Sequence, residues 1–130
     1  MERFKVGLKR AYEAASARDG YRVLVERLWP RGVRKADLRL DLWLKDVAPS
    51  AALRRWFGHD PARFPEFAAR YRRELRRGLA AEAFAEMMLR ASEGKVTLIY
   101  AAHDQIHNGA VVLRGEIERA LAAHPRPSHP

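Results

Sequence analysis

The sequence predicts an α/β fold, a small three-layer sandwich with a largely parallel or mixed sheet and helices on both faces. Residues 96–102 form a nearly continuous apolar run of strand length, which is typical of a strand covered on both faces. Segments with alternating apolar residues precede this run, and segments with helical spacing separate them. Such an alternation of strands and helices favours parallel strand pairing.

The N-terminal part supplies two of the expected strands. Phe4–Leu8 alternates apolar and polar residues and predicts a short strand, followed over 11–17 by a loop or one helical turn. After an Asp-Gly turn, Tyr21–Leu28 is rich in β-branched residues and predicts the central strand. Pro30 lacks an N–H and ends the ladder, and Gly32 favours a sharp turn.

The next segment predicts a further strand. Leucines at 38, 40, 42 and 44 recur at period two, as in a half-buried strand. A short helix within residues 41–45 remains an alternative interpretation.

Helix start and stop signals follow from residue 48 onwards. Ser50 is a typical N-cap for a helix over 51–57, and Gly58 is a typical terminator. Asp60 followed by Pro61 marks a second start. The helix that it opens carries one apolar stripe, made by Phe64, Phe67, Ala68, Tyr71 and Leu75.

Two more helices complete the expected fold. One runs over residues 80–92 and ends at Gly94, and the other runs over 109–122 with Asn108 as its cap. The length and the 48% hydrophobic content fit a single domain over residues 1–123. Residues 124–130 contain three prolines and predict a disordered tail.

The amino-acid composition excludes several kinds of functional site. The chain has no cysteine, which excludes a disulfide framework, a thiol nucleophile and a thiolate metal site, and which fits a reducing cytoplasm. No apolar run approaches the roughly 20 residues that cross a bilayer, so we expect a soluble, cytoplasmic protein without a membrane partner. A net charge of +9 favours anionic partners, although solvated surface arginines explain the same charge.

Polar residues follow three of the predicted strands. Ligands bind beyond the carboxyl ends of parallel strands, so we expect these residues to form one site. Guanidinium forks and helix N-termini suit phosphate or carboxylate oxygens, and two aromatic rings are available for stacking. The expected ligand is therefore a small phosphate-like or nucleotide-like anion, bound by Arg27, Trp29, Arg31, Gly32, Lys45, Ser50, Tyr100 and Asn108. Alternatively, Arg27 pairs with Asp46 or Asp104 and only pins the loops.

Whether the ligand is also transformed stays open. Asp46, His103 and Asp104 are the candidates for proton transfer. Ser50 with His103 and Asp104 is not interpreted as a hydrolase triad, because no Gly-x-Ser-x-Gly elbow is present. The histidines at 59, 103 and 107 lack the spacing of a zinc motif, so no metal site is expected. The chain has neither a Walker loop nor a Gly-x-Gly-x-x-Gly motif, and no cofactor is expected.

Two alternatives belong to other function classes. Residues 51–80 carry eight arginines against three acids, so the basic helix over 63–77 could bind nucleic acid phosphates. A solvated helix face explains the same arginines, since few aromatic residues and no helix-turn-helix pattern accompany them. The second alternative is a non-catalytic protein that binds a partner and uses the strand-end charges structurally.

Several motifs together resemble a known family. They are the segments 19–32, 42–50 and 53–61, the pairs Arg70-Tyr71 and Glu74-Leu75, and residues 96–102 with Asp104 and Asn108. In this order they resemble the YeaO-like family of small bacterial proteins, catalogued as domain of unknown function number 488. The resemblance spans nearly the whole chain and implies no specific activity. Family members commonly carry Arg or Lys where this chain has His103, so no role for a permanent cation at that position is implied.

Overall fold

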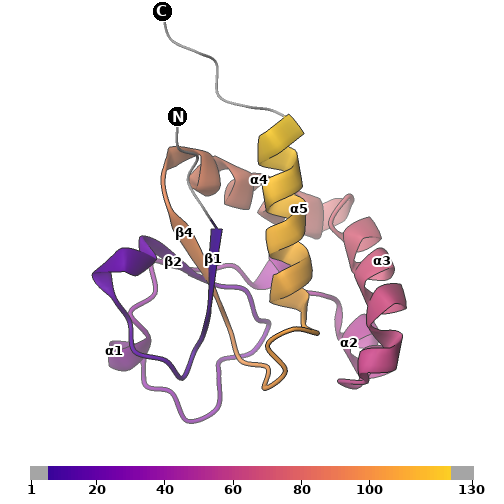
Figure 1. Cartoon of the computed structure of the whole chain (residues 1–130), viewed down its shortest axis with the longest axis horizontal. Coiled ribbons are helices and arrows are strands. Elements are labelled where there is room, and N and C mark those ends of the chain that lie inside the picture. The colour runs from indigo at the N-terminus through magenta and orange to yellow at the C-terminus, as the bar shows by residue number, and fades with distance from the viewer. Residues whose placement is uncertain (1–5, 124–130) are drawn as a thin grey trace, which may run out of the picture.

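The computed structural model describes residues 6–123 and contains a four-stranded parallel sheet. Its strands are β1 (Val6–Arg10), β2 (Tyr21–Leu24), β3 (Leu42–Trp43) and β4 (Val96–Tyr100), in the order β1-β4-β2-β3 (Figure 1). Leu98 of β4 pairs with Leu8 on one side and with Val23 on the other. Every residue of β4 is buried, which confirms the expected covered strand and the α/β class.

Residues 6–123 contain five α-helices and three 3-10 helices, of which all but α5 lie between strands. The α-helices are α1 (Lys35–Leu38), α2 (Ala51–Phe57), α3 (Phe64–Glu74), α4 (Gly78–Glu93) and α5 (Gly109–Ala123). The 3-10 helices are η1 (Ala17–Asp19), η2 (Lys45–Val47) and η3 (Pro61–Arg63). Among residues 6–123, none of these helices is both long enough and apolar enough to cross a membrane.

The two faces of the sheet are covered differently. The main core lies between one face and α2–α5, and it includes Val23, Leu98, Tyr71, Met87 and Leu113. On the other face, a smaller cluster forms around Leu24, Ile99, Leu38 and Ala11, where the short α1 and the loop with Trp29 provide the cover. The long helices therefore lie on one side (Figure 1).

The predicted helix signals are confirmed. Ser50 Oγ accepts a hydrogen bond from the N–H of Leu53, and Gly58 ends α2 in the left-handed conformation. Asp60 caps η3, which continues into α3. Asn108 Oδ1 accepts a hydrogen bond from the N–H of Val111 and so caps α5. The last two predicted helices also form, extended by one to two residues at their ends.

The predicted strand bounds were partly wrong. β2 ends at Leu24 rather than Leu28; the N–H of Val25 still donates to the carbonyl of Ile99, and then the chain turns away. Of residues 38–44, only Leu42 and Trp43 form a strand, because Arg39 adopts φ 48° and turns the chain after α1. β4 ends at Tyr100. Of the two alternatives for 11–17, the loop is correct up to Ser16, and η1 begins at Ala17. The first strand starts at Val6 among the described residues, so the predictions for Phe4 and for the 124–130 tail lie outside them.

A buried ion cluster fixes the turn before β2. The carboxylate of Asp19 pairs with Arg22 at 2.5 Å and with Lys9 at 2.8 Å. The guanidinium of Arg22 also donates to the carbonyl of Leu38 and so connects η1, β2 and α1. Gly20 follows at φ 66°, and a Cβ at this position would lie 2.4 Å from the carbonyl oxygen of Lys95.

Candidate functional site

All four strands are parallel, so their carboxyl ends lie at one edge of the sheet, the lower edge in Figure 1. The loops after β1, β2, β3 and β4 meet there, and we call this edge the strand-end rim. Tyr100 is the last residue of β4, and Lys45 and Asp46 follow β3. Ligands of parallel α/β sheets usually bind at this edge.

Arg27 at the rim is bound to the backbone. Its Nε donates to the carbonyl of Pro49 at 2.9 Å, and its Nη2 donates to the carbonyl of Ala48 at 3.1 Å. Arg27 thus pins the loop that leads into α2, as the structural alternative proposed, but through carbonyls. Among the described residues, it forms no ion pair with Asp46 or Asp104.

The Trp29 loop packs against the sheet. The indole N–H of Trp29 donates to the carbonyl of Val33, and its ring lies edge-on to Trp43 at 5.4 Å between centroids. The ammonium of Lys45 lies 4.2 Å from the Trp43 ring centre. Both tryptophan rings therefore contact other side chains of the protein. Arg31 and Gly32 lie exposed at the loop tip, where Gly32 has φ 77°.

The hydroxyl and the N–H of Ser50 are both hydrogen-bonded within the chain. Its hydroxyl donates to Glu74 Oε2 at 2.6 Å, and its N–H donates to Glu74 Oε1 at 2.9 Å. This pair joins the start of α2 to the end of α3. Side chains of the chain itself thus satisfy the N–H groups of Ser50 and Leu53 at the N-terminus of α2.

Asp104 organises the loop before α5. Its carboxylate accepts hydrogen bonds from the N–H groups of His107 and Ile106 and contacts His107 Nδ1 at 2.9 Å. These bonds lower the pKa of Asp104 to about 2, which makes it a weak base at neutral pH. The carbonyl of Asp104 accepts a hydrogen bond from the side-chain amide of Asn108.

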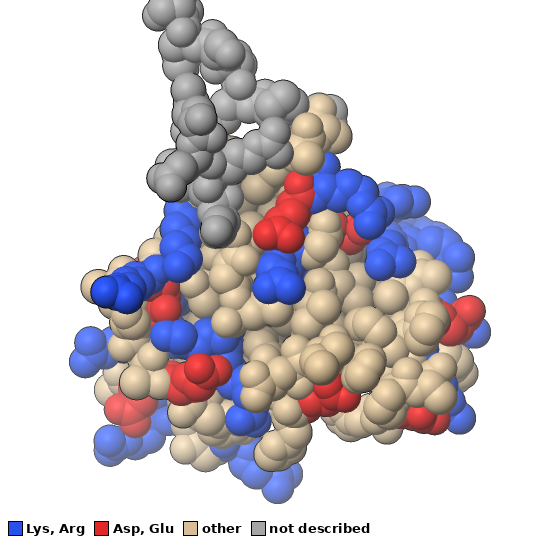
Figure 2. All heavy atoms as spheres, viewed as in Figure 1, with Lys and Arg blue, Asp and Glu red and all other residues tan. Residues whose placement is uncertain are grey.

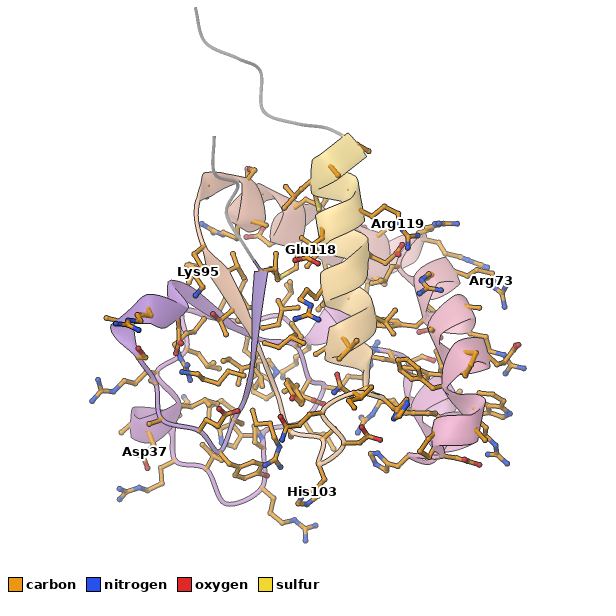
Figure 3. All side chains as sticks on the ribbon, viewed as in Figure 1. Asp37, Arg73, Lys95, His103, Glu118 and Arg119 are labelled. Carbon is orange, nitrogen blue, oxygen red and sulfur yellow. The ribbon has the colours of Figure 1, made fainter. Side chains whose placement is uncertain are left out.

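The three candidates for proton transfer do not meet. His103 is exposed and points away from the sheet at the lower edge of the molecule (Figure 3), and Asp46 is exposed in η2. No hydrogen bond or ion pair joins Asp46, His103 and Asp104 within residues 6–123. The same residues contain no group of three acidic or histidine side chains that could hold a metal ion.

Glu26 occupies the middle of the rim and was missed by the sequence reasoning. Its Oε2 accepts a hydrogen bond from the N–H of Ala101, directly after β4. Burial raises the pKa of Glu26, although that hydrogen bond and the charges of Arg54 and His59 lower it in part. The available signal was its place two residues after β2, which the longer predicted strand concealed.

A cavity of about 380 Å³ opens beside the ends of β1 and β4, on the side of α5. Burial raises the pKa of the Tyr100 phenol at this cavity, and the nearby charge of Glu13 raises it further while Arg10 and Arg114 lower it. Of the predicted ligand-binding residues, only Tyr100 lines this space. The lining is formed by Leu8, Glu13, Tyr100, Gln105, Ile106, Val111 and Arg114.

The basic helix predicted over 63–77 is shorter than expected, because α3 spans only Phe64–Glu74, and the arginines of 63–77 are partly neutralised. Arg63, Arg70 and Arg72 lie within ion-pair distance of Asp60, Glu66 and Glu116, respectively. The other three arginines, Arg73, Arg76 and Arg77, form no ion pair with any residue from 6 to 123. Figure 2 shows Lys and Arg gathered at the upper right, over the C-terminal ends of α3 and α5, and mostly uncharged atoms in the middle of the face.

Comparison with known proteins confirms the resemblance found in the sequence. A family model described as "Inactive DUF488-N3 subclade" matches residues 5–130. The chain belongs to the DUF488 family. It is 44% identical over 109 residues to an uncharacterized protein of Mycobacterium tuberculosis (strain H37Rv), a match that covers 84% of this chain and 90% of the relative.

A second relative places this DUF488 protein among the YeaO-like members. The chain is 40% identical over 106 residues to the uncharacterized protein YeaO of Escherichia coli (strain K12), covering 81% of this chain and 90% of YeaO. No solved structure matched the chain.

Proposed function

We propose that this DUF488 protein binds a small anionic ligand in the cavity beside β1 and β4 and releases it unchanged. The observation that carries the proposal is the joint presence of Tyr100, Gln105 and Arg114 around one cavity of about 380 Å³. Arg114 supplies a guanidinium fork for phosphate or carboxylate oxygens, and the phenol and the amide supply neutral donors. The volume falls within the usual range of small-molecule sites, about 300–1,000 Å³.

Glu13 limits the chemical classes of ligand that fit this cavity. This carboxylate lies in the same lining, and it already accepts a hydrogen bond from the N–H of Arg10. A ligand that meets both Arg114 and Glu13 needs an anionic group together with a hydroxyl or amino donor. Phosphorylated sugars and nucleotides have this combination, and the net charge of +9 attracts them at long range.

Two observations favour binding without turnover. The pKa of Asp104 is about 2, so its carboxylate is poorly suited to accept a proton. Among residues 6–123, no hydrogen bond or ion pair joins Asp104 to Asp46 or His103, or joins those two to each other. The matching family model is itself described as an inactive subclade. We place the binding function in the cytoplasm, where phosphorylated metabolites are available to a cysteine-free chain.

A thermal-shift panel of inorganic phosphate, a ribose phosphate and adenosine monophosphate tests the proposal. A ligand at 100 times its dissociation constant stabilises the folded state by about 2.7 kcal/mol. We expect the shift to disappear in Arg114→Gln and to decrease in Tyr100→Phe, while Arg55→Gln on the exposed side of α2 retains it. An unchanged shift in folded Arg114→Gln would contradict the proposal.

Arg31→Ala separates the two places on the rim where an anion could bind. The ligand set predicted from the sequence centres on Arg27, Arg31 and Lys45, whereas the cavity lies at Arg114. A ligand lost in Arg31→Ala but kept in Arg114→Gln would move the site to the Trp29 loop. The nucleic-acid alternative has its own signature, since each neutralised phosphate of duplex DNA adds about 0.9 to the salt slope of the affinity.

A further inference from the structure

A second cavity lies at the opposite end of the molecule from the strand-end rim. It has a volume of about 190 Å³ and opens between the C-terminal parts of α3 and α5 and the first half of α4. Leu75 and Phe84 contribute apolar surface, and Arg72, Arg76 and Arg119 contribute guanidinium groups. We call this surface the arginine groove.

The charges of the arginine groove are not balanced. Glu116 is the one acid in its lining, and its Oε2 lies 3.3 Å from Arg72 Nε and 3.1 Å from Arg119 Nη1. One carboxylate thus serves two arginines, while Arg76 has no acidic partner among residues 6–123. Figure 3 shows Arg119 on the side of α5 towards α3 and Glu118 on the other side, so Glu118 does not add negative charge here.

Hydrogen bonding in the arginine groove is also incomplete. Arg72 Nε and Glu116 Oε2 are both shielded from solvent, yet neither makes a hydrogen bond, because their approach has poor geometry. A shielded polar atom without a partner is costly. A carboxylate arriving from outside could bind the guanidinium of Arg72 and allow Glu116 to pair fully with Arg119.

The size and chemistry of the groove select the kind of partner. Its 190 Å³ is below the usual range for whole small molecules, about 300–1,000 Å³, and suits one side chain. We propose that the arginine groove docks an acidic segment of another protein, with one apolar side chain between Leu75 and Phe84 and flanking carboxylates on Arg72 and Arg76. Nucleic acid would use the arginines but leave the apolar surface without a role.

The test is a fluorescence anisotropy titration with the full chain. The probe is a labelled short peptide in which one phenylalanine is flanked on both sides by aspartates and glutamates. Two competitors accompany it, the same peptide with serine in place of phenylalanine and a single-stranded oligonucleotide of equal charge. We expect saturable binding of the phenylalanine peptide, with both competitors at least about tenfold weaker, a difference of about 1.4 kcal/mol.

Charge variants locate the binding. Arg76→Glu should weaken the phenylalanine peptide at least about tenfold, since reversal replaces attraction by repulsion across a desolvated contact. Arg18→Glu is the matched control and should bind normally, because Arg18 is exposed and lies in η1, at the left of Figure 1 and away from α3 and α5. Arg76→Gln serves as the second variant if Arg76→Glu fails to fold.

The inference would be overturned if the phenylalanine peptide did not bind, or if its serine version bound equally well. It would also be overturned if Arg18→Glu weakened binding as much as Arg76→Glu does. A fourth contrary outcome is an oligonucleotide that binds more tightly than the peptide and loses affinity in Arg76→Glu. The last outcome would assign the surface to nucleic acid. None of these results depends on the cavity at Arg114, so they leave the proposed ligand-binding function untouched.

Discussion

The carboxylate of Glu26 accepts a hydrogen bond from the backbone N–H of Ala101 and so links the ends of β2 and β4. The bond places an acid, rather than an anion-binding group, at the centre of the strand-end rim. Burial raises the pKa of this acid above its ordinary value of 4.5. The anionic ligand that we propose therefore lies to one side of Glu26, at Tyr100 and Arg114.

Glu26→Gln should stabilise the protein at neutral pH. Because the pKa of Glu26 is raised by burial, the folded state binds this proton more tightly than the unfolded state, and stability falls as the pH rises above 4.5. Glutamine keeps an acceptor for the N–H of Ala101 without the charge. Melting curves should show a higher Tm for the variant at pH 7 and a smaller difference near pH 4.5, with Glu118→Gln as an exposed control. A lower Tm at pH 7 would mean that Arg54 and His59 favour the carboxylate more than burial opposes it.

Asp104 should show the opposite pH dependence. Its hydrogen bonds lower its pKa from 3.8 to about 2, so its contribution to stability is complete above pH 3.8 and is lost as the pH falls towards 2. Asp104→Asn should therefore melt at a lower temperature than the parent protein above pH 5, and the difference should shrink below pH 4. A carboxyl NMR titration checks the pKa directly, and a value near 3.8 would contradict the hydrogen-bonded loop before α5.

Gly20→Ala and Gly32→Ala form a matched pair. Both glycines have positive φ, but a Cβ at Gly20 would lie 2.4 Å from the carbonyl oxygen of Lys95, whereas a Cβ at Gly32 would meet nothing within 4 Å. Gly32→Ala should cost about 1 kcal/mol from backbone strain alone. Gly20→Ala should cost about 3 kcal/mol, because the start of β2 must also move. Equal costs in urea unfolding would mean that the turn before β2 is looser than the structure has it.

Arg27→Ala decides between the structural and the ligand-binding interpretation of this residue. The variant loses the bonds to the carbonyls of Ala48 and Pro49 and should lower the free energy of unfolding by about 2 kcal/mol. Arg31→Ala at the exposed loop tip should change it by less than about 0.5 kcal/mol. Urea unfolding measures both. A stable Arg27→Ala variant that no longer binds the anion would make Arg27 a ligand-binding residue instead.

Local sequence patterns correctly predicted the helix caps, one helix terminator and the buried strand. The caps at Ser50 and Asn108, the stop at Gly58 and the covered strand that begins at Val96 all form where these patterns place them. Their backbone conformations depend on a few neighbouring residues and on apolar spacing. The parallel sheet and the shared strand-end rim followed from the same alternation of strands and helices.

Tertiary structure alone decided the strand ends and the use of each polar group. Whether Arg27 meets a ligand or the Pro49 carbonyl depends on where two loops pass each other, and no local pattern encodes that distance. The same holds for Glu26 at Ala101 and for Arg72 facing Glu116, which are contacts between segments far apart in the chain, and for Arg114 and Tyr100, which line one cavity from different elements. By itself the sequence determined the overall charge and the elements with local signals, but it predicted neither the short α1 nor the two-residue length of β3. The packing of those elements determined which charged side chains bond to other groups of the chain and which remain free to bind a ligand. This is so because a hydrogen bond forms only with a partner within about 3 Å.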